Sequence, residues 1–273
     1  MAGNNRTRNI ILIAGLLVIV AVAAGLYAFF GGESGVASGT ITAPTLDVSN
    51  RATPAATTEP TEEASAEAAV EATAEATAEA VAENTAEASA EASAAIIFNI
   101  LPEESQVSFT LDEELMGSPK TVIGVTDQVA GQILVDFANP SASQIGTIRI
   151  NVRTLTTDSD MRNRAIRRAI LRSDQDEFEF AELTNIEVSN MPEQVTMGQA
   201  FSFQVSGDFT LVGTTNRLTF DVSVMPLSET EITGTATTTV QRAMYGLEIP
   251  NAPGVANVSE DVVLQLDFTA RAG

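Results

Sequence analysis

The sequence predicts an all-β domain of antiparallel strands with one short helix, preceded by a transmembrane helix and a disordered stalk. Three observations support this prediction: an uncharged apolar run near the N-terminus, an acidic low-complexity repeat after it, and apolar side chains that alternate with period two from residue 96 onward. They divide the 273 residues into a cytoplasmic N-terminus (1–9), a membrane anchor (10–30), a stalk (31–95) and a β domain (96–273).

Residues 10–30 contain no charged side chain. A helix of this length, at about 1.5 Å per residue, spans a hydrocarbon core of roughly 30 Å. Arg6 and Arg8 precede the run and Glu33 follows it, so the positive-inside rule predicts a cytoplasmic N-terminus and an extracytoplasmic domain, periplasmic or at the cell surface. A cleaved signal peptide is the alternative, because residues 21–23 have a small-x-small pattern, but the run exceeds the usual ~7 to 15 apolar residues.

Residues 31–95 are rich in Ala, Glu and Thr, with twelve acids against one base. A glutamate recurs at every fourth position from Glu63 to Glu91. Carboxylates at this spacing repel one another on a helix, and large apolar residues are scarce, so the segment is predicted to be a disordered stalk. A stalk of this kind would give the domain reach from the bilayer. A peptide ligand or a glycosylated stalk is the alternative.

Period-two alternation predicts the strands of the β domain. Examples are Ile148 and Ile150, Phe201 and Phe203, and the run of residues 262–268. Antiparallel strands must protect their edges by closing into a barrel or by pairing two sheets, and the alternation does not choose between these. The apolar faces would either pack as a filled core or line a cavity, and the alternation alone favours the filled core.

Residues 160–172 predict the single helix, because apolar side chains recur on one face. Asp158 or Asp160 is the expected N-cap. Arg164, Arg167, Arg168 and Arg172 cover much of the opposite face. They are candidates to contact anionic headgroups, or a ligand's polar end at the mouth of a barrel. The alternative is a solvated face that pairs with nearby acids.

Composition excludes several function classes. The net charge of −22 disfavours nucleic acid as a partner. The chain has no Cys and no His, which excludes Ser-His-Asp and Cys-His hydrolases and thiolate metal sites. The acidic pairs near residues 158 and 174 lack EF-hand spacing. A protein without catalytic activity, cofactor or metal is therefore expected.

Five stretches of the β domain carry a further signal. The most specific is GDFTLVGTTNRLTFDVSV at residues 207–224. The others are residues 121–137, residues 171–174 with Phe178 and Phe180, residues 237–246 and residues 262–268. In their order and spacing these stretches resemble the YceI family of polyisoprenoid-binding, lipocalin-like barrels, and residues 207–224 are similar to a hairpin of that family. The likeness covers residues 105–270. It departs where the family usually has a Tyr-Pro pair and this chain has residues 180–184.

The resemblance implies an extracytoplasmic, eight-stranded barrel that holds an isoprenoid chain in its lumen, and it favours a cavity over a filled core. The residues expected to line that lumen are Phe109, Leu111, Val135, Phe137, Ile148, Ile150, Phe178, Phe180, Phe201, Phe203, Phe209, Leu211, Phe220, Leu264 and Leu266.

Two functions follow as hypotheses. The first is a lipid or isoprenoid carrier, tethered to the membrane through its N-terminal helix. The second is a cell-surface interaction or structural module with a filled interior. A continuous apolar tunnel of several hundred Å³ would favour the carrier. The oligomeric state is left open, with a homodimer among the alternatives.

Overall fold

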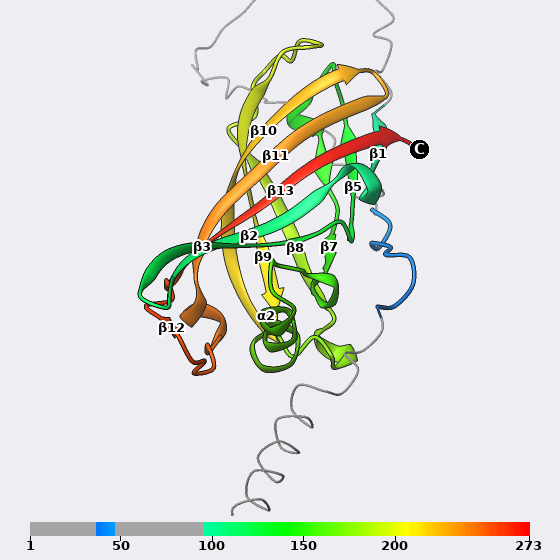
Figure 1. Ribbon diagram of the computed structural model, residues 1–273. Coiled ribbons are helices and arrows are strands. Elements are labelled where there is room, and N and C mark those ends of the chain that lie inside the picture. Colours follow the sequence, from blue (N-terminus) through cyan, green and yellow to red (C-terminus); the bar gives the residue numbers. More distant parts are fainter. Residues whose placement is uncertain (1–36, 47–94) are drawn as a thin grey trace, which may run out of the picture. The chain divides into compact units, whose positions relative to one another are not determined.

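The structure, a computed structural model, describes residues 37–46 and 95–273, which belong to one compact unit (Figure 1). The predicted anchor at residues 10–30 and most of the predicted stalk lie outside the described residues. In the part of the chain that is described, no helix is both long and apolar enough to cross a bilayer.

A curled antiparallel sheet makes up most of the domain, as Figure 1 shows. Its hydrogen-bonded order is β4-β7-β8-β9-β10-β11-β13-β1-β5-β6, and β2 pairs with β13, β12 and β3. The strands are β1 (Ile96–Ile100), β2 (Gln106–Leu115), β3 (Ser118–Thr126), β4 (Val129–Ala130), β5 (Gln132–Val135), β6 (Gln144–Ile145), β7 (Ile148–Asn151), β8 (Phe180–Ser189), β9 (Phe201–Leu211), β10 (Thr214–Ser228), β11 (Glu231–Gln241), β12 (Val255–Ala256) and β13 (Asp261–Ala272).

The prediction of an all-β antiparallel fold with one short helix is confirmed. The sheet has thirteen strands in the described residues rather than the predicted eight. Local breaks divide longer stretches: Gly131 separates β4 from β5, and the 3-10 turn η2 (Pro102–Glu104) separates β1 from β2. β4 and β5 are separated by one residue in the sequence but lie near opposite ends of the pairing order. The sheet must therefore curl back toward its own start. The Ile100 amide donates to the Gly131 carbonyl there at 3.0 Å.

The β9–β10 hairpin has an uninterrupted register from Leu211–Thr214 to Phe201–Val224. Its turn residues, Val212 and Gly213, both have positive φ, at 49° and 74°. Such turns match the right-handed twist of paired strands. The regular register keeps Phe203 and Val205 on the face that their period-two spacing predicts, and both are buried.

The helical segment is shorter than predicted. The α-helix α2 (Asp160–Ala165) passes into a π-helical turn, η5 (Ile166–Ile170). The N-cap is Ser159, whose hydroxyl accepts from the Arg162 amide at 3.4 Å. Asp158 does not cap the helix, because its carboxylate pairs with Lys120 at 2.5 Å and also with the Arg162 side chain.

Residues 37–46, here named the N-terminal strap, lie against the domain although the sequence assigns them to the stalk. Ile41 is buried. The Leu46 amide donates to Gln132 Oε1 at 2.8 Å, and Arg149 donates to the Thr42 carbonyl at 3.2 Å. These ten residues of the predicted stalk are therefore part of the folded unit.

Candidate ligand-binding site

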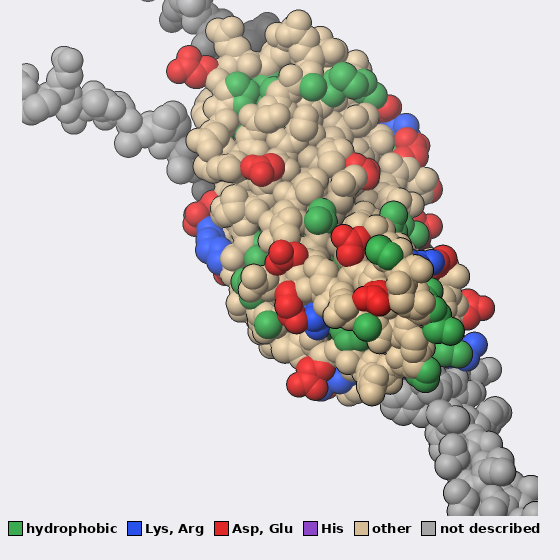
Figure 2. Space-filling view, turned by 60° about the vertical axis from the view of Figure 1, so that its left-hand side comes forward, with side chains coloured by type: hydrophobic (Ala, Val, Ile, Leu, Met, Phe, Trp, Pro, Cys, Tyr) green, Lys and Arg blue, Asp and Glu red, His purple; other side chains and the backbone are tan. Residues whose placement is uncertain are grey.

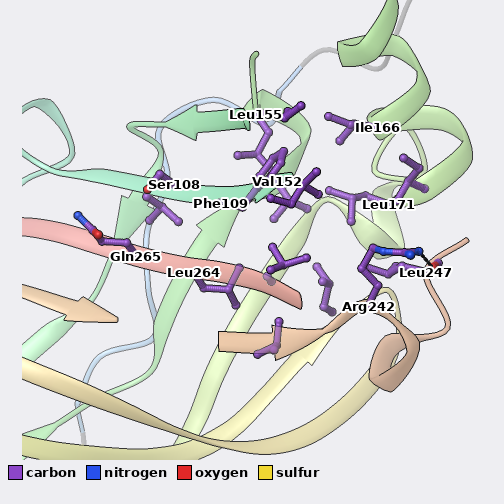
Figure 3. A pocket seen from close by; sticks show the side chains of 18 of the residues that line it. Ser108, Phe109, Val152, Leu155, Ile166, Leu171, Arg242, Leu247, Leu264 and Gln265 are labelled. Atoms are coloured by element: carbon purple, nitrogen blue, oxygen red, sulfur yellow. Dashed lines mark hydrogen bonds between the residues drawn. The ribbon is translucent and has the colours of Figure 1, made fainter. Parts of the chain in front are cut away.

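The curled sheet encloses a cavity of about 1380 Å³. Strands from β2 around to β13 form its wall, and the helical segment with residues 247–258 lies across one end. Figure 3 shows Leu155, Ile166 and Leu171 at that end, with Arg242 and Leu247 beside them. Ser108 and Gln265 lie farther from the helix, along β2 and β13. Most of the lining side chains are apolar, so the cavity suits an elongated apolar molecule.

Ten of the fifteen predicted lumen residues line this cavity. They are Phe109, Leu111, Ile148, Ile150, Phe203, Phe209, Leu211, Phe220, Leu264 and Leu266. The Phe109 ring has room because it lies over Gly124, where an added Cβ would come within 2.1 Å of the ring.

The other five lie elsewhere. Val135, Phe137 and Phe201 line a separate pocket of about 50 Å³. Contacts with other aromatic rings hold two of these side chains in place. The Phe137 ring meets the Phe98 ring edge-on, with 6.1 Å between ring centres, and the Phe201 ring stacks on the Phe203 ring at 5.8 Å. The remaining two rings are outside both pockets and are covered by guanidinium groups. Arg172 lies 4.4 Å from the centre of the Phe178 ring, and Arg149 lies 5.2 Å from that of Phe180.

Several lining residues were not predicted. Val205, Val222 and Val262 lie on the same alternating faces as predicted neighbours, so the period-two pattern could have included them. Leu155, Leu171 and Tyr245 come from turns and from the end of the helical segment, where no period marks an inner face. Burial raises the pKa of the Tyr245 phenol to about 12, which keeps the hydroxyl protonated.

The charged side chains of the lining gather at the helix end of the cavity, here named the mouth. Arg162 reaches buried Glu113 at 2.7 Å, and Arg242 reaches Glu260 at 2.5 Å. Of the four predicted arginines, Arg164 lines the cavity. Arg167 and Arg168 are half-buried on η5, and Arg172 is exposed over Phe178. The mouth thus combines charged groups of both signs with an apolar interior.

A buried ionic cluster lies near the mouth, where β8 begins. Glu179 accepts from Asn151 Nδ2 at 2.8 Å and lies 3.3 Å from Arg153. Ser38, in the strap, donates two hydrogen bonds to the same carboxylate. Its amide donates to Glu179 Oε1 at 2.7 Å, and its hydroxyl donates to Glu179 Oε2 at 2.5 Å. Arg153 also donates to the Ser173 carbonyl at 2.5 Å. The cluster ties the strap to the segment that follows the helix.

Glu179 is expected to make stability depend on pH. Desolvation opposes its ionisation, but hydrogen bonds from Ser38 and Asn151 and the charge of Arg153 outweigh it, so the pKa lies below the ordinary value of 4.5. A lowered pKa contributes stability above the unfolded-state pKa, and that contribution is lost as pH falls through the folded-state pKa. The melting temperature of Glu179→Gln should therefore lie below wild type at pH 7, with a gap that narrows below pH 4.5. A gap independent of pH would contradict this assignment.

Among the described residues, no group of three or more Asp or Glu side chains is placed to hold a metal ion. The chemistry that the cavity offers is binding: apolar burial along the wall, with charged and hydrogen-bonding groups at the mouth.

A family model described as the YceI-like domain matches residues 98–270. A polyisoprenoid binding domain from Saccharophagus degradans, implicated in plant cell wall breakdown, has a TM-score of 0.50 at 17% identity, covering 66% of this chain and 99% of that one. BcnA from Burkholderia cenocepacia has a TM-score of 0.48 at 16% identity, covering 62% and 98%. The YceI protein of Campylobacter jejuni has a TM-score of 0.43 at 11% identity, covering 53% and 81%. A search of curated proteins found no match.

Proposed function

This chain belongs to the family of YceI-like domains, and from that premise we propose that it is a membrane-tethered, extracytoplasmic binding protein for an isoprenoid or another long apolar lipid. The observation that carries the proposal is the cavity of about 1380 Å³ with its apolar wall. Ligand pockets commonly measure about 300 to 1,000 Å³, so this one has room for a chain longer than a compact metabolite.

The cavity argues against the alternative of an interaction module with a filled core. Protein interiors pack as densely as organic crystals and leave few voids larger than a water molecule. Here Phe109, Phe203 and Phe220 face a shared space. Burial of a lipid chain against this wall would contribute about 25 cal/mol per Å² of apolar surface, offset by the ordering of the chain.

The charged groups at the mouth suit a lipid that has one polar end. In this proposal the apolar chain lies along the wall, and its polar group faces Arg164. Arg167, Arg168 and Arg172 lie nearby on the helical segment as headgroup or membrane contacts. The neighbour from Saccharophagus degradans, named for polyisoprenoid binding, supports an isoprenoid as the ligand class. The proposed tether is the apolar run at residues 10–30.

Lipid extraction tests the proposed function. The full chain, purified from membranes in mild detergent, should release a long-chain isoprenoid or similar apolar lipid in a fixed ratio to protein, as measured by mass spectrometry. The delipidated chain should then bind a radiolabelled long-chain polyprenol saturably. If no lipid is released and polyprenol binding does not saturate, the proposal fails.

A further inference from the structure

The N-terminal strap fixes where the described chain approaches the domain from its N-terminal side. Ser38 donates twice to Glu179, and Ile41 is buried. Leu46, at the other end of the strap, donates to Gln132. The strap is thus held at both ends and in the middle, and its Ser38 end lies at the buried ionic cluster.

That cluster is at the mouth end of the domain. Arg153, which pairs with Glu179, also donates to the Ser173 carbonyl just beyond the helical segment. The helical segment lines the mouth through Met161, Arg164 and Ile166. The β10–β11 hairpin tip, residues 228–231, lies at the opposite end of these long strands, because the β9–β10 turn is on the mouth side.

Chain length limits how far the mouth can be from a membrane span at residues 10–30. Eight residue steps separate Phe30 from Ser38, and at about 3.5 Å per step they reach at most about 28 Å. Without the strap, the tether would run to residue 95 and could reach roughly 230 Å by the same measure. The docked strap therefore changes a long tether into a short one attached at the mouth.

The mouth also carries exposed apolar side chains. Met116 is 81% exposed, Met161 69% and Met244 41%. Met161 lines the cavity, Met116 contacts Gly254 beside the lining residue Pro253, and Met244 precedes the lining residue Tyr245. We name these three methionines the mouth rim. In the face drawn in Figure 2, hydrophobic side chains lie at both the upper and the lower end of the described domain, and charged side chains of both signs are more frequent in its lower half.

Arginines also gather at the mouth. Residues 160–170 contain four arginines and one acid, and one of these arginines, Arg162, pairs with Glu113 and Asp158. Residues 225–235, which include the hairpin tip at the opposite end, contain Glu229 and Glu231, and Glu231 pairs with Arg271. Anionic lipid headgroups attract arginine near the surface by about 1 kcal/mol each and repel carboxylates.

We propose that the mouth rim is a docking surface for the bilayer that carries residues 10–30, and that the strap holds the mouth against it. This inference rests on the proposed membrane tether and deepens the proposed function, because it assigns the route by which a lipid passes between bilayer and cavity. The acidic segment between residues 47 and 94 is then an insertion between strap and domain and does not act as the tether.

The absence of Cys from the chain allows a direct test. The full chain carrying Met161→Cys or Leu227→Cys is labelled with an environment-sensitive fluorophore and reconstituted in vesicles of phosphatidylcholine and phosphatidylglycerol that contain a brominated phosphatidylcholine. Both positions are exposed, at 69% and 46%, but Leu227 lies next to the distal hairpin tip. The label at residue 161 should be quenched several-fold more than the label at residue 227. Equal quenching, or stronger quenching at residue 227, would overturn the inference.

Strap variants test the holding role in the Met161→Cys background. Ile41→Asp places a charge at a buried site, and Thr42→Asp places the same charge on an exposed neighbour. Quenching should fall toward the level of residue 227 in Ile41→Asp and stay unchanged in Thr42→Asp. Ser38→Ala, a milder change, should lower quenching partly if Ile41→Asp fails to fold. Quenching that is unchanged in both Ile41→Asp and Ser38→Ala would overturn the role of the strap.

Lipid extracted from the same vesicle samples separates this inference from the proposed function. Bound lipid together with equal quenching at residues 161 and 227 overturns the docking surface and leaves the carrier intact. Quenching selective for residue 161 with an empty cavity supports the docking surface and contradicts the carrier.

Discussion

Phe203→Asp is expected to abolish lipid retention and to lower the free energy of unfolding by at least about 3 to 5 kcal/mol at pH 7. Phe203 is 7% exposed, lines the cavity and stacks on Phe201. Truncation of a buried Phe alone costs about 3 to 5 kcal/mol. An unpaired carboxylate in an apolar space adds a desolvation cost, which would be relieved in part by protonation at acid pH. Chemical denaturation and mass spectrometry of extracted lipid measure the two effects.

Two variants control for this substitution. Ser202→Asp adds the same charge on the adjacent, exposed position of β9, and it should change stability by no more than about 0.5 kcal/mol. Phe203→Leu keeps the position apolar and should retain lipid. If Phe203→Asp retains as much lipid and stability as Ser202→Asp, the inner face of β9 is assigned incorrectly.

The long strands explain why much of the cavity wall could be predicted. In the long strands β9, β10 and β13, apolar side chains alternate with polar ones over many residues, so Phe203, Phe220 and Leu264 fall on the inner face that their spacing predicts. The same rule does not apply at short elements. Phe178 ends the 3-10 turn η6 (Asp176–Phe178), where period two no longer describes the direction of a side chain. Phe137 follows the end of β5, where the chain leaves the sheet.

The strap could not be predicted because its signal is not local. Ile41 is one apolar residue among Gly, Thr and Pro, a composition typical of a flexible segment. Its burial depends on a surface built from residues about a hundred positions later in the chain. Glu179 was missed for the same reason, because nothing in its sequence neighbourhood distinguishes a buried carboxylate from an exposed one.

Arg153→Ala is expected to lower the free energy of unfolding by about 3 to 5 kcal/mol, because it leaves the carboxylate of Glu179 buried without its counter-ion. The side chains of Arg153 and Glu179 are 4% and 2% exposed. Arg217→Ala breaks a pair with Glu187 whose side chains are 43% and 77% exposed. This control variant should lower the free energy of unfolding by only about 0 to 1 kcal/mol. Urea denaturation of both variants and wild type gives the comparison.

A double-mutant cycle with Glu179→Ala separates the charge pair from the other bonds of Arg153. Arg153→Ala/Glu179→Ala should lose less stability than the sum of the single variants, because removal of both partners leaves no uncompensated charge. The difference in free energy of unfolding between wild type and Arg153→Ala should also become smaller as pH falls, since protonation of Glu179 neutralises the carboxylate that has lost its counter-ion. Two results together would contradict this account: strictly additive losses of unfolding free energy in the double variant, and a loss in Arg153→Ala that is the same at neutral and acid pH. They would mean that Arg153 stabilises the domain through the Ser173 carbonyl and Asp176 rather than through Glu179.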